Sequence, residues 1–543
     1  MTTTEQKSGG SSVLANSAVM AAGTLFSRAS GFIRSALLVA ALGSGLHADV
    51  FNIANTVPNM LYILLAGGVF NAVLVPQLVK AQKNDEDGGA AYTDRIITLA
   101  GLFLGVVTIV LVVGAPLLMR LYLGADWYSA DHRDQLESAI DFARWCLPQV
   151  FFYGMFVLVG QMLNARGSFG PMMWAPIANN IIAISTLVLY LVVFGPSNTG
   201  GFTTGQETLL GLGSTLGIVL QFLLLLPVLR RVGVRYRPRF DFRGSGLSHT
   251  ARLGMWTMLF VVVNQVAYTI VTRLASSGSA EDGTGYTVYS NSFLVTQVPH
   301  SIITVSLATA ILPVLSRHGA AGELPELGRT LSHQLRNALA IIIPIAALLP
   351  VLAEDIAHIL FGYGAGADAF RTYAPTLSVF GAGLIFFTIH YLLLRGFYSL
   401  ERNRTVFFIQ CSVAATNIVA AVLLTRAFDD TAATLAAAYS LSYLVGSVVS
   451  YVVLKRTLGD LDGRGLIGFL ARLIMVTLVA AAAAWLLRTG LGMLNDEPTM
   501  VLALIGAAIV GALHLGMLLL GAQAAQVKEL TAMVQQVARR LRR

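Results

Sequence analysis

The sequence predicts an all-α polytopic membrane protein with about fourteen transmembrane helices. Of its 543 residues, 55% are hydrophobic and only 12% are charged, and the mean hydropathy is +0.71. Soluble domains carry about 25% charged residues. The apolar residues also gather in runs of about 20 or more, the length that a helix needs to cross the hydrocarbon core of a bilayer.

The apolar runs give the order of the predicted spans. The first six cover residues 17–43, 49–80, 95–122, 141–164, 168–194 and 207–230. The next six cover 250–275, 286–315, 331–353, 372–398, 403–426 and 432–455, and the last two cover 467–488 and 499–523. The first run is too long and too rich in arginine for a cleaved signal peptide, so we expect it to be a retained span.

The basic residues predict the orientation. With the N-terminus in the cytoplasm, 27 of the 36 lysines and arginines fall in cytoplasmic loops and ends. Five fall in outside loops, namely Arg120, Arg133, Arg371, Arg426 and Arg488. This bias follows the positive-inside rule, and the even number of spans then places both termini in the cytoplasm.

Composition and motifs exclude several classes of protein. The net charge of +8 is spread over the ends of apolar runs and does not form the basic face of a nucleic-acid-binding domain. Cys146 and Cys411 lie in apolar runs and provide no disulfide framework. No HExxH, CxxC or GxxxxGK[ST] motif occurs, so the sequence predicts a transporter without a cofactor or metal rather than an enzyme.

A weak internal repeat predicts two lobes. The prolines Pro58 and Pro76 of span two match Pro299 and Pro313 of span eight, each pair followed by a basic exit. Both spans would exit on the same side, so we expect two six-helix lobes related by a parallel pseudo-two-fold repeat. The predicted segments are a cytoplasmic tail over 1–12, an N-lobe over 13–232, a basic inter-lobe loop over 233–247, a C-lobe over 248–456, two extra helices over 457–524 and a basic tail over 525–543.

Two of these segments allow more than one interpretation. The basic loop is an orientation anchor and linker, or a contact with anionic lipid headgroups. The basic tail has apolar residues at helical spacing, so it is an amphipathic helix at the inner surface or a solvated tail.

Arg28 and Arg34 are the strongest candidates for a functional site. Both lie near the middle of the first span, where an arginine costs about 2.5–3.5 kcal/mol on insertion scales. Six residues place them about 120° apart on a helix, so they could line one broad cavity. The planar guanidinium suits a phosphate group, and snorkelling toward an interface is the structural alternative.

Span two carries a second set of polar candidates. Asp49 opens the span, where it could cap the helix or serve a function. Asn52, Asn55 and Asn59 follow on one helical face, either as contacts between helices or as the wall of a binding site.

Three further polar groups lie in later apolar runs. Arg273, near the outer end of span seven, could snorkel or face a cavity. Arg144 lies three residues after Asp141, which favours a local ion pair. His390 could relay protons, but a neutral, hydrogen-bonded histidine between helices is the more common case.

The N-terminal motifs resemble a known family. FSRxxGFxR, ADxFxxAxxxPNxL and VPxLxxA follow one another in the order found in MurJ/MviN lipid II flippases, within the multidrug/oligosaccharidyl-lipid/polysaccharide exporter superfamily. The resemblance implies that Arg28 and Arg34 contact a lipid diphosphate in a central cavity. It also implies that Asp49 is a required acid, and that Asn59 belongs to the family's Pro-Asn pair.

The sequence departs from the family pattern at a few positions. Basic residues and an acid that many members carry in span two are replaced here by Tyr62, Ile63 and Gly67. A third cavity arginine, which usually comes from span eight, is replaced by Leu294. Our hypothesis is that Arg273 supplies this missing charge.

The resemblance also implies a mechanism, a location and partners. We expect alternating access in the bacterial cytoplasmic membrane, with lipid II, an undecaprenyl-diphosphate-linked disaccharide peptide, as the substrate and the last two spans forming a groove for its tail. Membrane lipids and other cell-wall synthesis or division proteins are further candidate partners. A cation-coupled multidrug exporter and a flippase for another polyprenyl-diphosphate-linked glycan remain the alternatives.

Overall fold

The computed structural model describes residues 23–24, 26–64, 87–241, 247–281, 283–495 and 499–541. These residues form two compact units. One contains the chain up to Ala280 together with Tyr363–Ala365, and the other contains Glu281–Gly362 and the chain from Gly366 onward. Span seven therefore groups with the N-terminal helices by compactness, whereas the sequence repeat assigns it to the second lobe. The predicted lobe boundary at 233–247 rests on the sequence repeat alone, and it stays a prediction.

The first unit begins with a helix over residues 26–42, named here the first helix. It continues with α2 (Leu46–Tyr62), α4 (Ala90–Val113), α5 (Ala115–Tyr122), α6 (Arg133–Cys146), α7 (Gln149–Ala165), α8 (Gly170–Phe194), α9 (Thr204–Leu223), α10 (Leu225–Arg231) and α11 (Leu247–Ala280). Two short 3₁₀ turns, Ala125–Tyr128 and Ala130–His132, join α5 to α6.

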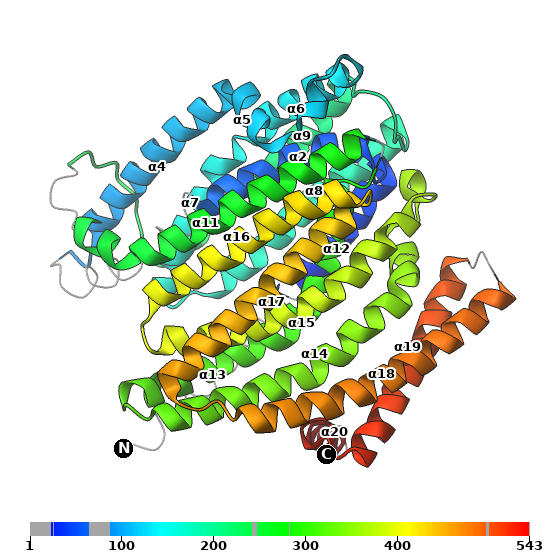
Figure 1. Ribbon diagram of the computed structural model, residues 1–543. Helices are drawn as coiled ribbons and strands as arrows, with labels where there is room; N and C mark the ends of the chain where they lie inside the picture. The colour runs from blue at the N-terminus through cyan, green and yellow to red at the C-terminus, as the bar shows by residue number, and fades with distance from the viewer. Residues whose placement is uncertain are drawn as a thin grey trace. The chain divides into compact units, whose positions relative to one another are not determined.

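The second unit is also helical (Figure 1). Its helices are α12 (Tyr286–Pro299), α13 (Val305–Ala320), α14 (Leu324–Phe361), α15 (Tyr373–Ser399), α16 (Asn403–Ala427), α17 (Thr431–Leu458), α18 (Gly463–Leu494), α19 (Met500–Ala524) and α20 (Lys528–Leu541).

The predicted fold class is confirmed as an all-helical polytopic membrane protein. In the described part of the chain, twelve helices are long and apolar enough to cross a membrane, and each coincides with one of the predicted spans three to fourteen. The first two predicted spans, 17–43 and 49–80, extend beyond the described ranges, as do Gly67 and Pro76. The total of fourteen therefore stays a prediction.

Several spans that the sequence predicts as continuous are interrupted. Span three ends as α4 at Gly114 and resumes as α5, and span four breaks at Pro148 between α6 and α7. Span eight contains a π turn over His300–Thr304, directly after Pro299. A proline removes a backbone donor and clashes with the preceding turn, which explains the breaks at Pro148 and Pro299.

Capping groups fix several helix starts. Thr203 and Gln206 form a reciprocal capping box at the start of α9. Asp430 accepts a hydrogen bond from the Ala433 amide at α17, and Asp462 does the same for Gly465 at α18. Such caps satisfy amide groups that the first turn of a helix leaves without partners.

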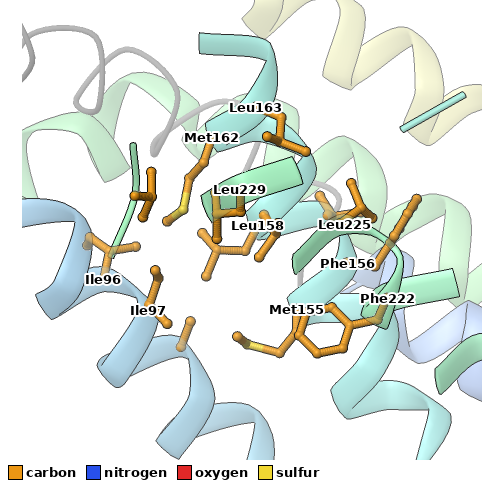
Figure 2. Packing of buried hydrophobic residues seen from close by; sticks show 14 of the residues in the cluster. Ile96, Ile97, Met155, Phe156, Leu158, Met162, Leu163, Phe222, Leu225 and Leu229 are labelled. Atoms are coloured by element: carbon orange, nitrogen blue, oxygen red, sulfur yellow. The ribbon is translucent and has the colours of Figure 1, made fainter. Parts of the chain in front are cut away.

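Each unit has its own apolar core. Figure 2 shows the core of the first unit, where α4, α7, α9 and α10 meet around Ile97, Met155, Leu158, Phe222 and Leu229.

In the second unit, α14 packs against α18 and α19, the two C-terminal helices that lie outside the predicted repeat. Val527 and Leu530 extend this core to the start of α20, so the tail begins as a packed helix.

Three smaller predictions have clear outcomes. Arg144 and Asp141 form the expected ion pair, with Nη1 and Oδ1 2.7 Å apart. His390 is buried, and its Nδ1 lies 3.1 Å from the Ser450 hydroxyl, as expected for a histidine between helices. Cys146 is a buried free thiol, and Cys411 is a half-buried one.

Candidate functional site

The first helix is held against α8 by a buried asparagine. Asn180 Nδ2 donates to the Ser27 carbonyl oxygen at 2.9 Å and to Ser30 Oγ at 2.8 Å. Ser27, Ser30 and Arg34 are spaced i, i+3 and i+7, so they share one face of the helix. The Asn180 contacts therefore fix the rotation of the helix that carries both candidate arginines.

Arg34 lies beside a pair of tyrosines from two other helices. It is half-buried and interacts electrostatically with Tyr153 of α7. The Tyr153 ring stacks on Tyr62 of α2, with ring centroids 5.3 Å apart and planes 20° apart. Arg34 thus interacts with Tyr153, and α2 contributes the tyrosine that stacks on Tyr153.

Arg28 is on a different face of the first helix and is exposed. Within the described ranges, neither Arg28 nor Arg34 has a carboxylate within 4.0 Å. A local ion pair is one usual way to accommodate an arginine in a span, and the described residues form none with these two groups. Both guanidinium groups therefore keep the capacity to bind an anion.

Asp49 lies in the first turn of α2 and is fully buried. The N-cap position of this helix is Gly45, four residues before Asp49. His47 and Phe202 stack over the same turn with ring centroids 3.9 Å apart. The role of Asp49 as a required acid stays a prediction.

The asparagines of α2 do not act alike. Asn55 Oδ1 accepts a hydrogen bond from Gln149 Nε2 at 3.2 Å, and Gln149 also donates to Thr215 at 3.3 Å, so Asn55 belongs to a contact among three helices. Asn52 and Asn59 are half-buried on the same helix. For Asn55 the structure supports the interpretation as a contact between helices.

Arg273 has a structural partner of its own. Its Nη1 donates to the backbone carbonyl of Arg120 in the last turn of α5. Carbonyls at the end of a helix lack partners within the helix, and a cation there is favourable. The structure therefore gives Arg273 a role in packing α11 against α5, and its role as a third cavity charge stays a hypothesis.

Sequence reasoning missed Tyr153, Gln149 and Asn180. All three interrupt apolar runs with a polar atom, which is the signal that could have identified them. They lack a charge, however, and an uncharged polar residue is common in a span.

The site suits binding rather than bond chemistry. Two guanidinium groups can bind a phosphate through bidentate hydrogen bonds, and the phenols can donate further ones. In the described part of the chain, no group of three or more His, Cys, Asp and Glu residues could hold a metal ion.

Comparison with known proteins identifies the family. The profile of the family described as "Lipid II flippase MurJ" matches residues 38–493. A "Probable lipid II flippase MurJ" of Haemophilus influenzae is 28% identical over 399 residues, covering 70% of this chain and 75% of that protein. One from Synechocystis is 27% identical over 480 residues and covers 87% of both chains.

Solved structures share the fold. A lipid II flippase MurJ in an inward closed conformation aligns with a TM-score of 0.72 at 17% identity, over 93% of this chain and 99% of that one. An inward-facing multidrug MATE transporter aligns with a TM-score of 0.64 at 15% identity, over 81% and 95%.

The fold and the candidate spans define a multi-pass membrane protein with the architecture shared by MurJ and MATE proteins. Because the family profile covers most of its length, the chain belongs to the lipid II flippase MurJ family. It is a transporter of peptidoglycan synthesis rather than an enzyme.

Proposed function

We propose that this protein moves lipid II from the inner to the outer leaflet of the bacterial cytoplasmic membrane by alternating access. In this proposal Arg28 and Arg34 bind the diphosphate in a wet cavity. The observation that carries it is that neither guanidinium has a carboxylate partner within the described ranges, although both lie in a predicted span. An arginine without such a partner is expensive in a span unless it meets water or an anion.

The remaining parts of the site have supporting roles in the proposal. Asp49 is a required acid at the outer end of span two, and Asn52 and Asn59 face the substrate. Asn55 positions α2 through its contact with Gln149. Binding must differ between the inward and outward states, because equal affinity for both would shift neither.

The two C-terminal helices are proposed to hold the polyprenyl tail. Large apolar side chains along α18 and α19 are exposed on the surface of the second unit, among them Leu478, Leu486, Met493 and Leu504. Both termini are proposed to lie in the cytoplasm, in accord with the distribution of basic residues.

The test is depletion of the protein in a bacterium that carries it. We expect lipid II to accumulate on the inner leaflet, and wild-type protein to reverse this. Arg28→Ala and Arg34→Ala should each fail to reverse it although they reach the membrane at wild-type levels. Arg144→Ala is the matched control, since Arg144 already has Asp141 as its partner.

Two results would contradict the proposal. Full rescue by both alanine variants would remove the arginines from the mechanism. Unchanged lipid II on depletion, combined with a new sensitivity to organic cations, would favour a multidrug exporter instead.

A further inference from the structure

The described part of the segment between α10 and α11 is held along α4. We name residues 232–241 the strap. The Arg237 amide donates to Asp94 Oδ1 at 3.2 Å, and the Arg239 amide donates to Thr98 Oγ1 at 3.1 Å. The strap therefore has a defined backbone, although it contains no helix or strand (Figure 1).

Side chains fix the strap further. The Tyr236 hydroxyl lies 3.0 Å from Thr98 Oγ1, and Arg95 binds Asp241 with Nη2 and Oδ2 2.5 Å apart. Val234 is buried in the core of the first unit. A segment held by a buried side chain and by polar contacts at several points keeps its outward-pointing side chains in place.

Three of the exposed side chains of the strap are arginines, and two more arginines lie at the end of α10. The basic patch consists of Arg230 and Arg231 at the end of α10 and Arg235, Arg237 and Arg239 in the strap, and all five are exposed. Within the described residues, none of the five forms an ion pair. The patch is a preformed array of cations.

Among the described residues, the acids near the strap already have partners. Hydrogen bonds from the Ala91 and Gly89 amides hold the pKa of Asp87 below its usual value, although Arg239 also interacts with it electrostatically. The hydrogen bond from Arg95 lowers the pKa of Asp241 in the same way. Asp87 caps the start of α4, whereas Asp94 and Asp241 hold the strap. Among the described residues, the five arginines of the patch outnumber these three carboxylates.

The position of the strap and its exposed aromatic residues indicate the kind of ligand that the basic patch binds. The strap directly follows the candidate span Thr204–Arg231. It contacts the second and third turns of α4, which has no charged residue after Arg95. Phe240 is 68% exposed and Tyr236 is 45% exposed, next to the arginines. Basic residues with aromatic neighbours at a membrane boundary are typical of contacts with anionic lipid.

We propose that the basic patch is a binding site for anionic phospholipid headgroups at the membrane surface. The phosphate groups would accept hydrogen bonds from the strap arginines, while Tyr236 and Phe240 enter the interfacial layer. This site is separate from Arg28 and Arg34 and does not depend on which substrate the protein transports.

The test uses the full-length protein in detergent with equal amounts of phosphatidylglycerol and phosphatidylcholine, and native mass spectrometry counts the bound lipids. The wild type should retain phosphatidylglycerol preferentially. R235Q/R237Q/R239Q should lower this preference by at least about tenfold, because each arginine near a membrane surface contributes roughly fivefold. R235K/R237K/R239K should keep most of it.

The matched control is R317Q/R404Q/R456Q, which removes the same charge at exposed arginines of other helix ends. An unchanged preference in the glutamine variant of the strap would overturn the proposal, as would an equal loss in the control. An unchanged melting temperature in phosphatidylcholine shows that the variant is folded. If the triple variant is not monodisperse, R237Q alone should lose about fivefold, and no loss there would count against the site.

A second measurement separates lipid from protein partners. A photoreactive amino acid at Phe240 should crosslink to phospholipid in cells. Crosslinking to a protein, with no difference between the two lipids in the mass spectra, would reject the lipid site.

Discussion

Arg34 and Arg488 both lie in long helices but have different surroundings. Arg488 Nε donates to Asp355 Oδ2 at 2.6 Å, and the side chains of these residues are 21% and 5% exposed. Glu354 lies 4.0 Å from the same guanidinium and binds Arg371. Arg34 has a phenol beside it and, in the described ranges, no carboxylate within the same reach.

The difference teaches what each arginine contributes. Arg488 is neutralised within the fold, so its removal should affect stability. Arg34 lacks such a partner, so its removal should affect transport and leave the fold intact. The following predictions test this contrast, in order of decreasing effect.

The largest effect is expected for Arg34→Ala. Loss of a bidentate contact between charged groups should lower lipid II transport by about a hundredfold or more. Transport into the outer leaflet of reconstituted vesicles measures it, and the melting temperature should stay within experimental error of the wild type. A large fall in melting temperature with normal transport would show that Arg34 stabilises the fold and is not needed for transport.

Arg488→Leu should show the opposite pattern. It leaves Asp355 buried without its partner, which should destabilise the protein by about 2–4 kcal/mol. Thermal unfolding in detergent measures this loss. Adding Asp355→Leu should restore most of the stability, because replacing both partners removes the unpaired charge; no recovery in the double variant would show that the pair is not the cause.

Arg273→Gln distinguishes the two roles of Arg273. Glutamine can still donate to the Arg120 carbonyl oxygen but carries no charge. If Arg273 is the third cavity charge, as proposed, transport should fall by about tenfold at unchanged protein level. Normal transport by this variant would reject the role as a cavity charge. The packing of α11 against α5 would then be the role that remains for Arg273.

The smallest effect is expected for the exposed pair of Arg95 and Asp241. The folded-state pKa of Asp241 is lowered below the usual 3.8. The pair therefore contributes its full stability above pH 3.8, and this stability is lost as the pH falls through the lowered pKa. Asp241→Asn should speed hydrogen exchange in residues 234–241 without changing the melting temperature. Equal exchange rates in both proteins at neutral pH would show that Asp94 and Thr98 hold the strap by themselves.

The fold was largely predictable because length and hydropathy determine spans directly. The predicted spans three to fourteen each match a helix of the structure. Helix ends were less predictable: Arg488 was expected in an outside loop, whereas α18 continues to Leu494. Hydropathy detects the apolar part of a helix but not the turns that extend beyond it.

The site was only partly predictable. A charge in an apolar run identifies Arg28 and Arg34 from the sequence, because its burial is so unfavourable. The Tyr62–Tyr153 stack and the Asn180 contacts join helices distant in sequence, and no periodicity encodes such pairs. Local spacing did predict the ion pair of Arg144 and Asp141, since both lie on one helical face.

The two thiols have a practical consequence for measuring motion. Cys146 is fully buried and Cys411 is half-buried, so a water-borne maleimide meets no fully exposed native cysteine in this chain. Paired spin labels or fluorophores at introduced cysteines can therefore report distance changes during a transport cycle with little background. Replacement of Cys411 alone should remove most of the labelling that remains.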